Sequence, residues 1–136
     1  MPGPLILVVE DEPLILADIE SALIDGGYEV ASATMADDAM RTLEESAEPP
    51  AGLITDIRLG GGQPSGWDIA HRARELSTGI GVIYMSGDSG ADWASKGVPE
   101  SIFIQKPFAL AQMVTAISSV LNNSSRLPAI GEKSDD

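Results

Sequence analysis

Three short apolar stretches of this chain each run directly into residues that could do chemistry. They are Leu5–Val9 before Glu10-Asp11-Glu12, Leu53–Thr55 before Asp56, and Ile102–Ile104 before Gln105-Lys106-Pro107. If the three stretches are strands of one parallel sheet, their C-terminal ends lie side by side, and ligand sites form in the crevice just beyond them. Such a sheet would bring Glu10, Asp11, Asp56 and Lys106 together at one edge.

Three carboxylates at one edge would repel one another. At a separation of about 6 Å and an effective dielectric constant near 20, each pair repels by roughly 3 kcal/mol, which one lysine offsets only in part. Such a cluster takes up a proton or binds a cation. Carboxylate oxygens without His or Cys favour Mg²⁺, so the sequence predicts a magnesium site. The alternative is that Glu10-Asp11-Glu12 only caps the following helix, because acids are favourable at helix N-termini.

The same residues suggest phosphoryl transfer. The carboxylate of Asp56 could act as a nucleophile and form an aspartyl phosphate. Lys106 could pair with the transferred phosphoryl group as a point charge, and Ser86, after another apolar stretch, could donate its hydroxyl to the same oxygens. Taken singly, Ser86 reads as an ordinary turn residue and Lys106 as a surface charge. The hypothesis of phosphoryl transfer therefore depends on Asp56, Lys106 and Ser86 occurring together.

Composition excludes several other classes of function. The 136-residue chain has no cysteine, which removes disulfides, thiol catalysis and cysteine-bound zinc, and its single histidine, His71, cannot form a multi-histidine metal site. A net charge of −13 argues against direct binding of nucleic acid or anionic lipid, so cations and basic protein surfaces are the expected partners. No apolar run approaches the ~18 residues of a membrane span, and the N-terminus lacks signal-peptide features. We expect a cytoplasmic protein.

Five strand–helix units alternate along the chain. Strands are predicted at 5–9, 28–33, 51–55, 80–85 and 101–104, and helices at 13–25, 35–45, 67–76, 91–96 and 110–121. This order predicts an α/β fold, a parallel sheet with helices on both faces joined by right-handed crossovers. The period is lost after Asn122, so we expect one domain over 1–122 and a flexible tail over 123–136.

From Leu5 to Leu121 the chain resembles the receiver domain of bacterial two-component response regulators. The resemblance rests on four motifs in order: the acidic pair Glu10-Asp11 after Leu-Val-Val, Asp56 after the third strand, Ser86 after the fourth, and Lys106-Pro107-Phe108 after the fifth. It implies a doubly wound, flavodoxin-like sheet in the order 2-1-3-4-5. It also implies that Glu10, Asp11, Asp56 and the backbone carbonyl of Arg58 hold Mg²⁺, and that the Lys106-Pro107 bond is cis.

The function implied by this resemblance is a phosphoacceptor switch in a two-component phosphorelay. Asp56 would accept phosphate from a sensor histidine kinase or a histidine phosphotransfer protein, with Lys106 and Ser86 contacting the phosphoryl group. We expect a stand-alone regulator that signals through a downstream protein or phosphate relay, with a homodimer as a further option. It would be no enzyme beyond its own phosphorylation and slow dephosphorylation.

The chain departs from the family pattern at several places. Glu10 stands where Asp is more common, and Phe103 occupies the switch-aromatic position where Tyr is frequent, so no aromatic hydroxyl can take part in a switch that links Ser86 to Phe103. The loop after Asp56 is about two residues longer than usual, and the segment from Ser86 to Phe103 is about two residues shorter, which should shrink the fourth helix.

Two other functions compete with the switch. A Mg²⁺-dependent phosphohydrolase with Asp56 as nucleophile usually has a second acid two residues later, where this chain has Arg58, and needs a larger substrate site. A degenerate receiver would bind partners without phosphorylation, which the intact Asp56, Lys106 and acidic pair argue against.

Overall fold

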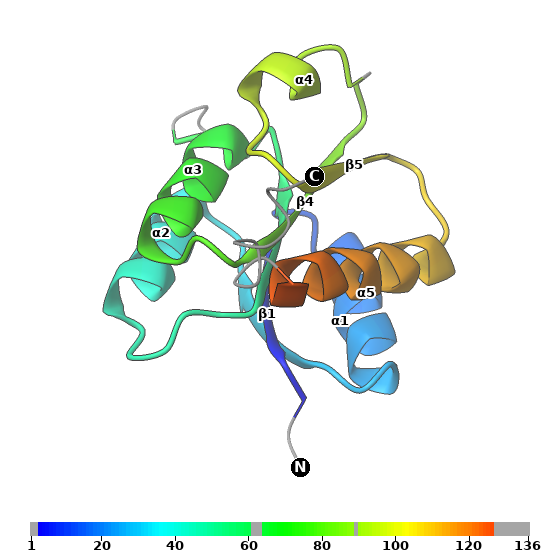
Figure 1. Ribbon diagram of the computed structural model, residues 1–136. Coiled ribbons are helices and arrows are strands. Elements are labelled where there is room, and N and C mark those ends of the chain that lie inside the picture. The colour runs from blue at the N-terminus through cyan, green and yellow to red at the C-terminus, as the bar shows by residue number, and fades with distance from the viewer. Residues whose placement is uncertain (1–2, 61–63, 89, 127–136) are drawn as a thin grey trace.

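The strands of the chain form a single sheet between two layers of helices, as the computed structural model shows (Figure 1). The structure describes residues 3–60, 64–88 and 90–126, with side chains as far as residue 122. The strands are β1 (Leu5–Val9), β2 (Glu29–Ala33), β3 (Gly52–Asp56), β4 (Gly81–Ser86) and β5 (Ser101–Gln105). They are parallel and lie in the order β2-β1-β3-β4-β5, which confirms the predicted fold class and strand order.

Helices cover both faces of this sheet within the described residues. They are α1 (Pro13–Asp25), α2 (Ala36–Glu45), α3 (Gly66–Leu76), α4 (Trp93–Lys96) and α5 (Leu110–Arg126). α1 and α5 lie on one side of the sheet and α2 and α3 on the other, while the short α4 stands apart from both layers (Figure 1). No helix in the part of the chain that the structure describes is long and apolar enough to cross a membrane.

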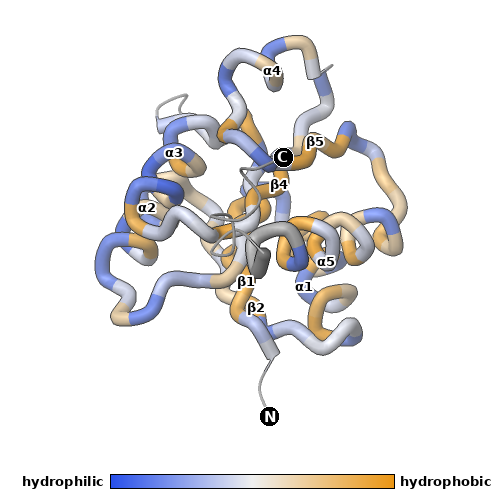
Figure 2. Tube along the Cα trace, in the orientation of Figure 1, coloured by the Kyte–Doolittle hydropathy of each residue, from blue (hydrophilic) through white to orange (hydrophobic). Residues whose placement is uncertain are grey.

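The core consists of two apolar clusters, one on each face of the sheet. β3 and β4 are buried along their whole length, as expected for strands that helices cover on both faces. Hydrophobic residues gather along the strands at the centre of the molecule (Figure 2). The cluster under α2 and α3 contains Leu7, Val9, Leu53, Val82 and Tyr84 together with helix residues such as Ile69 and Ala73. The cluster under α1 and α5 contains Ile6, Val8, Ile54, Ile83 and Met85 together with helix residues such as Ile19 and Ile117. Strand residues alternate between the two faces, so the sheet is held rigidly from both sides.

The register of the sheet brings the polar strand ends together. Val9 at the end of β1 lies beside Thr55, so Glu10, which follows β1, and Asp56, which ends β3, occupy neighbouring positions. Asp56 pairs with Met85, one residue before Ser86. Because the strands are parallel, all of these ends open on the same edge.

Several details differ from the predicted elements. α4 has four residues, shorter than the predicted 91–96, and α5 continues to Arg126, four residues past the predicted domain end at 122. The rest of the predicted tail, 127–136, lies outside the described residues, as do residues 61–63 of the loop after Asp56. The Lys106-Pro107 peptide bond is cis, as predicted.

Candidate functional site

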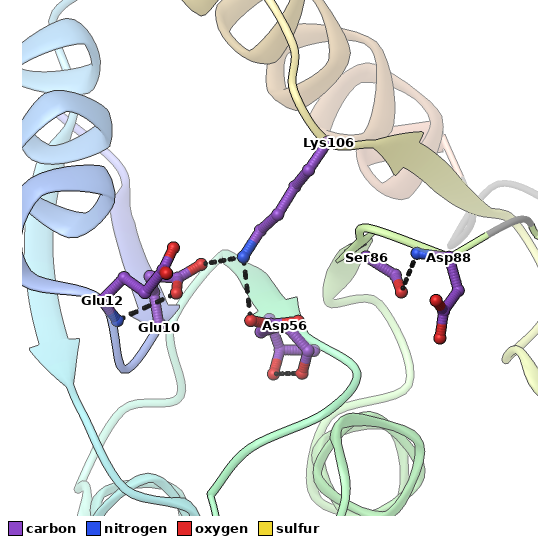
Figure 3. A network of polar contacts seen from close by, with 7 residues as sticks. Glu10, Glu12, Asp56, Ser86, Asp88 and Lys106 are labelled. Atoms are coloured by element: carbon purple, nitrogen blue, oxygen red, sulfur yellow. Dashed lines mark hydrogen bonds and ion pairs between the residues drawn. The ribbon is translucent and has the colours of Figure 1, made fainter.

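Lys106 is the centre of the contacts at the C-terminal edge of the sheet (Figure 3). It follows β5, and its Nζ lies 2.8 Å from Oε1 of Glu10 and 2.9 Å from Oδ2 of Asp56. The Lys106 side chain is 17% exposed, so both ion pairs are largely withdrawn from water. Burial lowers the pKa of Lys106, but the two carboxylates outweigh that effect and raise it, which keeps the ammonium charged.

Glu10 is completely buried and held in place by two different groups. Its Oε1 forms the ion pair with Lys106, and its Oε2 accepts the backbone N–H of Glu12 at 3.0 Å. Burial raises the pKa of Glu10, and repulsion by Asp56 adds to this, although Lys106 and the Glu12 N–H act in the opposite direction. A buried carboxylate with a raised pKa gains from any cation that reaches it.

The pKa of Asp56 is raised by burial in the same way as that of Glu10. It ends β3 with 7% of its surface exposed. Burial raises the pKa of Asp56 and the charge of Asp11 adds to that, against the lowering effect of Lys106 and of the backbone N–H of Arg58. The two buried carboxylates thus share one lysine, which leaves negative charge at this edge only partly compensated.

The residues present fit a hard divalent cation. Glu10, Asp11 and Asp56 each offer a carboxylate oxygen, and these oxygens lie within 4.8 Å of one another. Two of the carboxylates are buried and Asp11 is exposed, which leaves the cluster open on the solvent side. An all-oxygen set that combines carboxylates with room for water is suited to Mg²⁺. The structure therefore brings together the acidic residues predicted from the sequence.

Ser86 and Arg58 line the same pocket as Asp56 and Lys106. Ser86 ends β4 and is buried, and its Oγ accepts the backbone N–H of Asp88 at 3.0 Å (Figure 3). The Arg58 side chain forms an ion pair with the Asp88 carboxylate at 2.6 Å, across the mouth of the site. The role of the Arg58 carbonyl as a metal ligand stays a prediction. Asp88 carries no signal in the sequence, because no spacing rule pairs residues of two separate loops.

The chain matches the family model of the response regulator receiver domain over residues 6–118. Among curated proteins it is 28% identical over 123 residues to the transcriptional regulatory protein PrrA of Mycobacterium tuberculosis, which covers 88% of this chain and 50% of PrrA. The chain thus spans about half the length of the curated relatives it matches first.

Solved structures that resemble this chain are also receiver domains. The response regulator receiver protein of Sinorhizobium medicae is 39% identical with a TM-score of 0.85, and the match covers 90% of this chain and 97% of that one. A receiver domain protein from Clostridium thermocellum is 27% identical with a TM-score of 0.79, covering 91% and 98%. Together with the family match over most of the sequence, these likenesses show that the chain belongs to the family of response regulator receiver domains.

Proposed function

We propose that the chain is a phosphoacceptor switch of a two-component phosphorelay, which receives a phosphoryl group on Asp56. The observation that carries this proposal is the place of Asp56: a buried carboxylate at the end of β3, 2.9 Å from Lys106 and within a cluster of acids. Membership of the receiver family supports the same function. The phosphodonor would be a sensor histidine kinase or a histidine phosphotransfer protein.

The transfer uses the carboxylate of Asp56 as the nucleophile. One of its oxygens attacks the phosphorus of a phosphohistidine, and the P–N bond breaks as its electron pair returns to the imidazole nitrogen, which takes a proton from water. The product is an acyl phosphate on Asp56. Lys106, already within contact of Asp56, balances the negative charge of the new phosphoryl oxygens, and the Ser86 hydroxyl is available to donate to them.

Glu10, Asp11 and Asp56 would hold Mg²⁺, with the Arg58 carbonyl as a further ligand. A bound Mg²⁺ supplies positive charge that neutralises the oxygens of the transferred phosphoryl group. The raised pKa values of Glu10 and Asp56, caused mainly by burial, support a site that gains stability from a cation. We propose no other cofactor.

The output would be a change in protein contacts or the passage of phosphate to a further carrier. A chain with a net charge of −13 is poorly suited to bind nucleic acid itself, so a downstream protein is the proposed target. We place the protein in the cytoplasm, where histidine kinases phosphorylate their partners. Its only catalysis would be on itself, as phosphorylation and slow hydrolysis of the acyl phosphate.

Intact mass measurement tests the proposal. The chain is incubated with acetyl phosphate and Mg²⁺, and wild type should gain one phosphoryl group that is lost again over time. Asp56→Asn and wild type in EDTA should gain none, and the control Asp37→Asn, in the first turn of α2, should label like wild type. Equal labelling of wild type and Asp56→Asn would refute the assignment. Hydrolysis of a phosphomonoester such as p-nitrophenyl phosphate at many turnovers would favour the phosphohydrolase.

A further inference from the structure

A cavity of about 440 Å³ lies beside Ser86 and is separate from the acidic cluster. Its wall is mixed: the apolar side chains of Ile57, Leu59, Trp67, Trp93 and Phe103 line it together with polar and charged residues, which include Arg58, Asp88 and Lys96. Phe103 also lines a groove on the other side, between β5 and α5, and is only partly buried. The Phe103 ring thus lies between two hollows that both open to the protein surface.

Trp93 of α4 packs on Phe103. The two ring centroids are 6.4 Å apart and the rings are inclined by 32°. The indole is also fixed by a hydrogen bond, since Trp93 Nε1 donates to Ser101 Oγ at 2.9 Å. Ser101 in turn donates its hydroxyl to the backbone carbonyl of Val98 at 2.6 Å. One ring contact and one hydrogen bond therefore hold the indole along the same strand that carries Phe103.

The backbone of the β4–β5 connection presses directly against both rings. A Cβ atom at Gly90 would lie 2.9 Å from Cδ2 of Phe103, and one at Gly97 would lie 2.5 Å from Cδ1 of Trp93. Real Cβ atoms do not approach that closely, so only glycine fits at either position without a shift of the rings. α4, at four residues, is too short to cover β5 as a helix, and the aromatic contact takes its place.

We propose that Trp93 and Phe103 form an aromatic latch, in which Trp93 holds Phe103 in the resting position and must leave Ser101 when the switch is activated. The proposal rests on the proposed function. The Phe103 ring can either keep its present position against Trp93 or enter the cavity beside Ser86. Movement of Ser86 towards a phosphoryl group on Asp56 enlarges the cavity on that side. Entry of the Phe103 ring then removes the surface on which the indole packs.

This latch has a thermodynamic consequence at Asp56. If phosphorylation favours the open latch, weakening the closed latch must tighten binding of a phosphoryl mimic by the same factor, because coupling between two sites is reciprocal. Removing the hydrogen bond between Trp93 and Ser101 should favour the open state about fivefold. Wherever the closed state dominates, the affinity for beryllofluoride with Mg²⁺ should rise about fivefold as well.

Calorimetric titration with beryllofluoride and Mg²⁺ tests that consequence. Ser101→Ala and Trp93→Phe remove the same hydrogen bond from its two ends, so each should bind about fivefold more tightly, and the double variant should bind no more tightly than either. The matched control is Ser32→Ala, which removes a strand serine whose hydroxyl bonds Glu20 at the far edge of the sheet, and it should bind like wild type. Affinities of both latch variants equal to wild type would overturn the latch.

Fluorescence gives a second readout on the same samples. In Trp67→Phe, Trp93 is the sole tryptophan, and beryllofluoride should shift its emission to the red and increase its quenching by acrylamide. Beryllofluoride that binds while Trp93 emission and quenching stay constant would overturn the latch alone. Failure of wild type to bind beryllofluoride or to label with acetyl phosphate would overturn the proposed function and the latch with it.

Discussion

Replacing Asp56 with asparagine should stabilise the metal-free protein, although it destroys the proposed phosphorylation site. The change removes one negative charge from a cluster whose carboxylate oxygens lie within 4.8 Å of one another, and it almost preserves the shape of the side chain. At an effective dielectric constant of 20, repulsion between the buried Glu10 and Asp56 is about 3.5 kcal/mol. The exposed Asp11 is screened by water and adds only about 1 kcal/mol.

Two further energies, attraction by Lys106 and burial of the carboxylate, decide whether Asp56→Asn raises or lowers the stability of the protein. Lys106, 2.9 Å from Asp56, attracts it by about 6 kcal/mol on the same dielectric scale. Burial of the carboxylate opposes that attraction with several kcal/mol, of which we take about 3. Repulsion and burial together exceed the attraction by about 1–2 kcal/mol, in agreement with the raised pKa of Asp56, which burial mainly causes. The free energy of unfolding of Asp56→Asn should therefore be about 1–2 kcal/mol higher than that of wild type, which corresponds to a Tm roughly 4–8 °C higher.

Urea unfolding at pH 7 in EDTA, followed by circular dichroism, measures this difference. The control is Glu48→Gln, which removes an exposed charge between α2 and β3 and should change stability by less than about 0.5 kcal/mol. Mg²⁺ at ten times its Kd should stabilise wild type by about 1.4 kcal/mol and the variant by much less, so the gap narrows. An Asp56→Asn protein that is equal to or less stable than wild type in EDTA would refute the charge balance described for this site.

Three other perturbations probe the same physical account. Lys106→Ala leaves Glu10 and Asp56 without their shared cation and should lower the unfolding free energy in EDTA by about 3 kcal/mol; an unchanged urea midpoint would contradict this. Burial raises the pKa of Glu10 and Asp56 in the folded state, so their contribution to stability is complete below the ordinary values of 4.5 and 3.8 and is lost as pH rises through the folded-state pKa. Metal-free wild type should therefore gain stability relative to Asp56→Asn as pH falls from neutrality, and a relative loss in urea titrations would refute the sign. Tyr84→Phe leaves the Val98 N–H without its acceptor, bonded at 3.0 Å, and should cost about 1–3 kcal/mol and speed exchange of that amide; unaltered exchange would show that the bond is unimportant.

The fold and the acidic edge could be predicted because their signals are local in the sequence. A continuous apolar run marks a strand that is covered on both faces, and five such runs alternating with helices leave few topologies open. Because the strands are parallel, their C-terminal ends place Glu10, Asp56 and Lys106 at the same edge of the sheet. The ion pairs of Lys106 with Glu10 and Asp56 form at that predicted edge.

Features that depend on two loops meeting in space could not be predicted in the same way. The ion pair of Arg58 with Asp88 and the hydrogen bond of Trp93 with Ser101 join residues that no periodicity relates. The end of α5 was also misjudged, because Asn and Ser are weak helix formers and yet the helix continues to Arg126. The roles of Ser86 and Phe103 in a switch stay predictions.

Chemical location of the phosphoryl group tests the central claim most directly. Wild type is labelled with acetyl phosphate and Mg²⁺ and then treated with borohydride, which reduces an acyl phosphate of aspartate to homoserine and leaves free carboxylates unchanged. Peptide mass spectrometry should find homoserine at position 56 in labelled wild type, and aspartate there in a sample treated without acetyl phosphate. Homoserine at another aspartate, or unmodified Asp56 in protein that carries a phosphoryl group, would contradict the account.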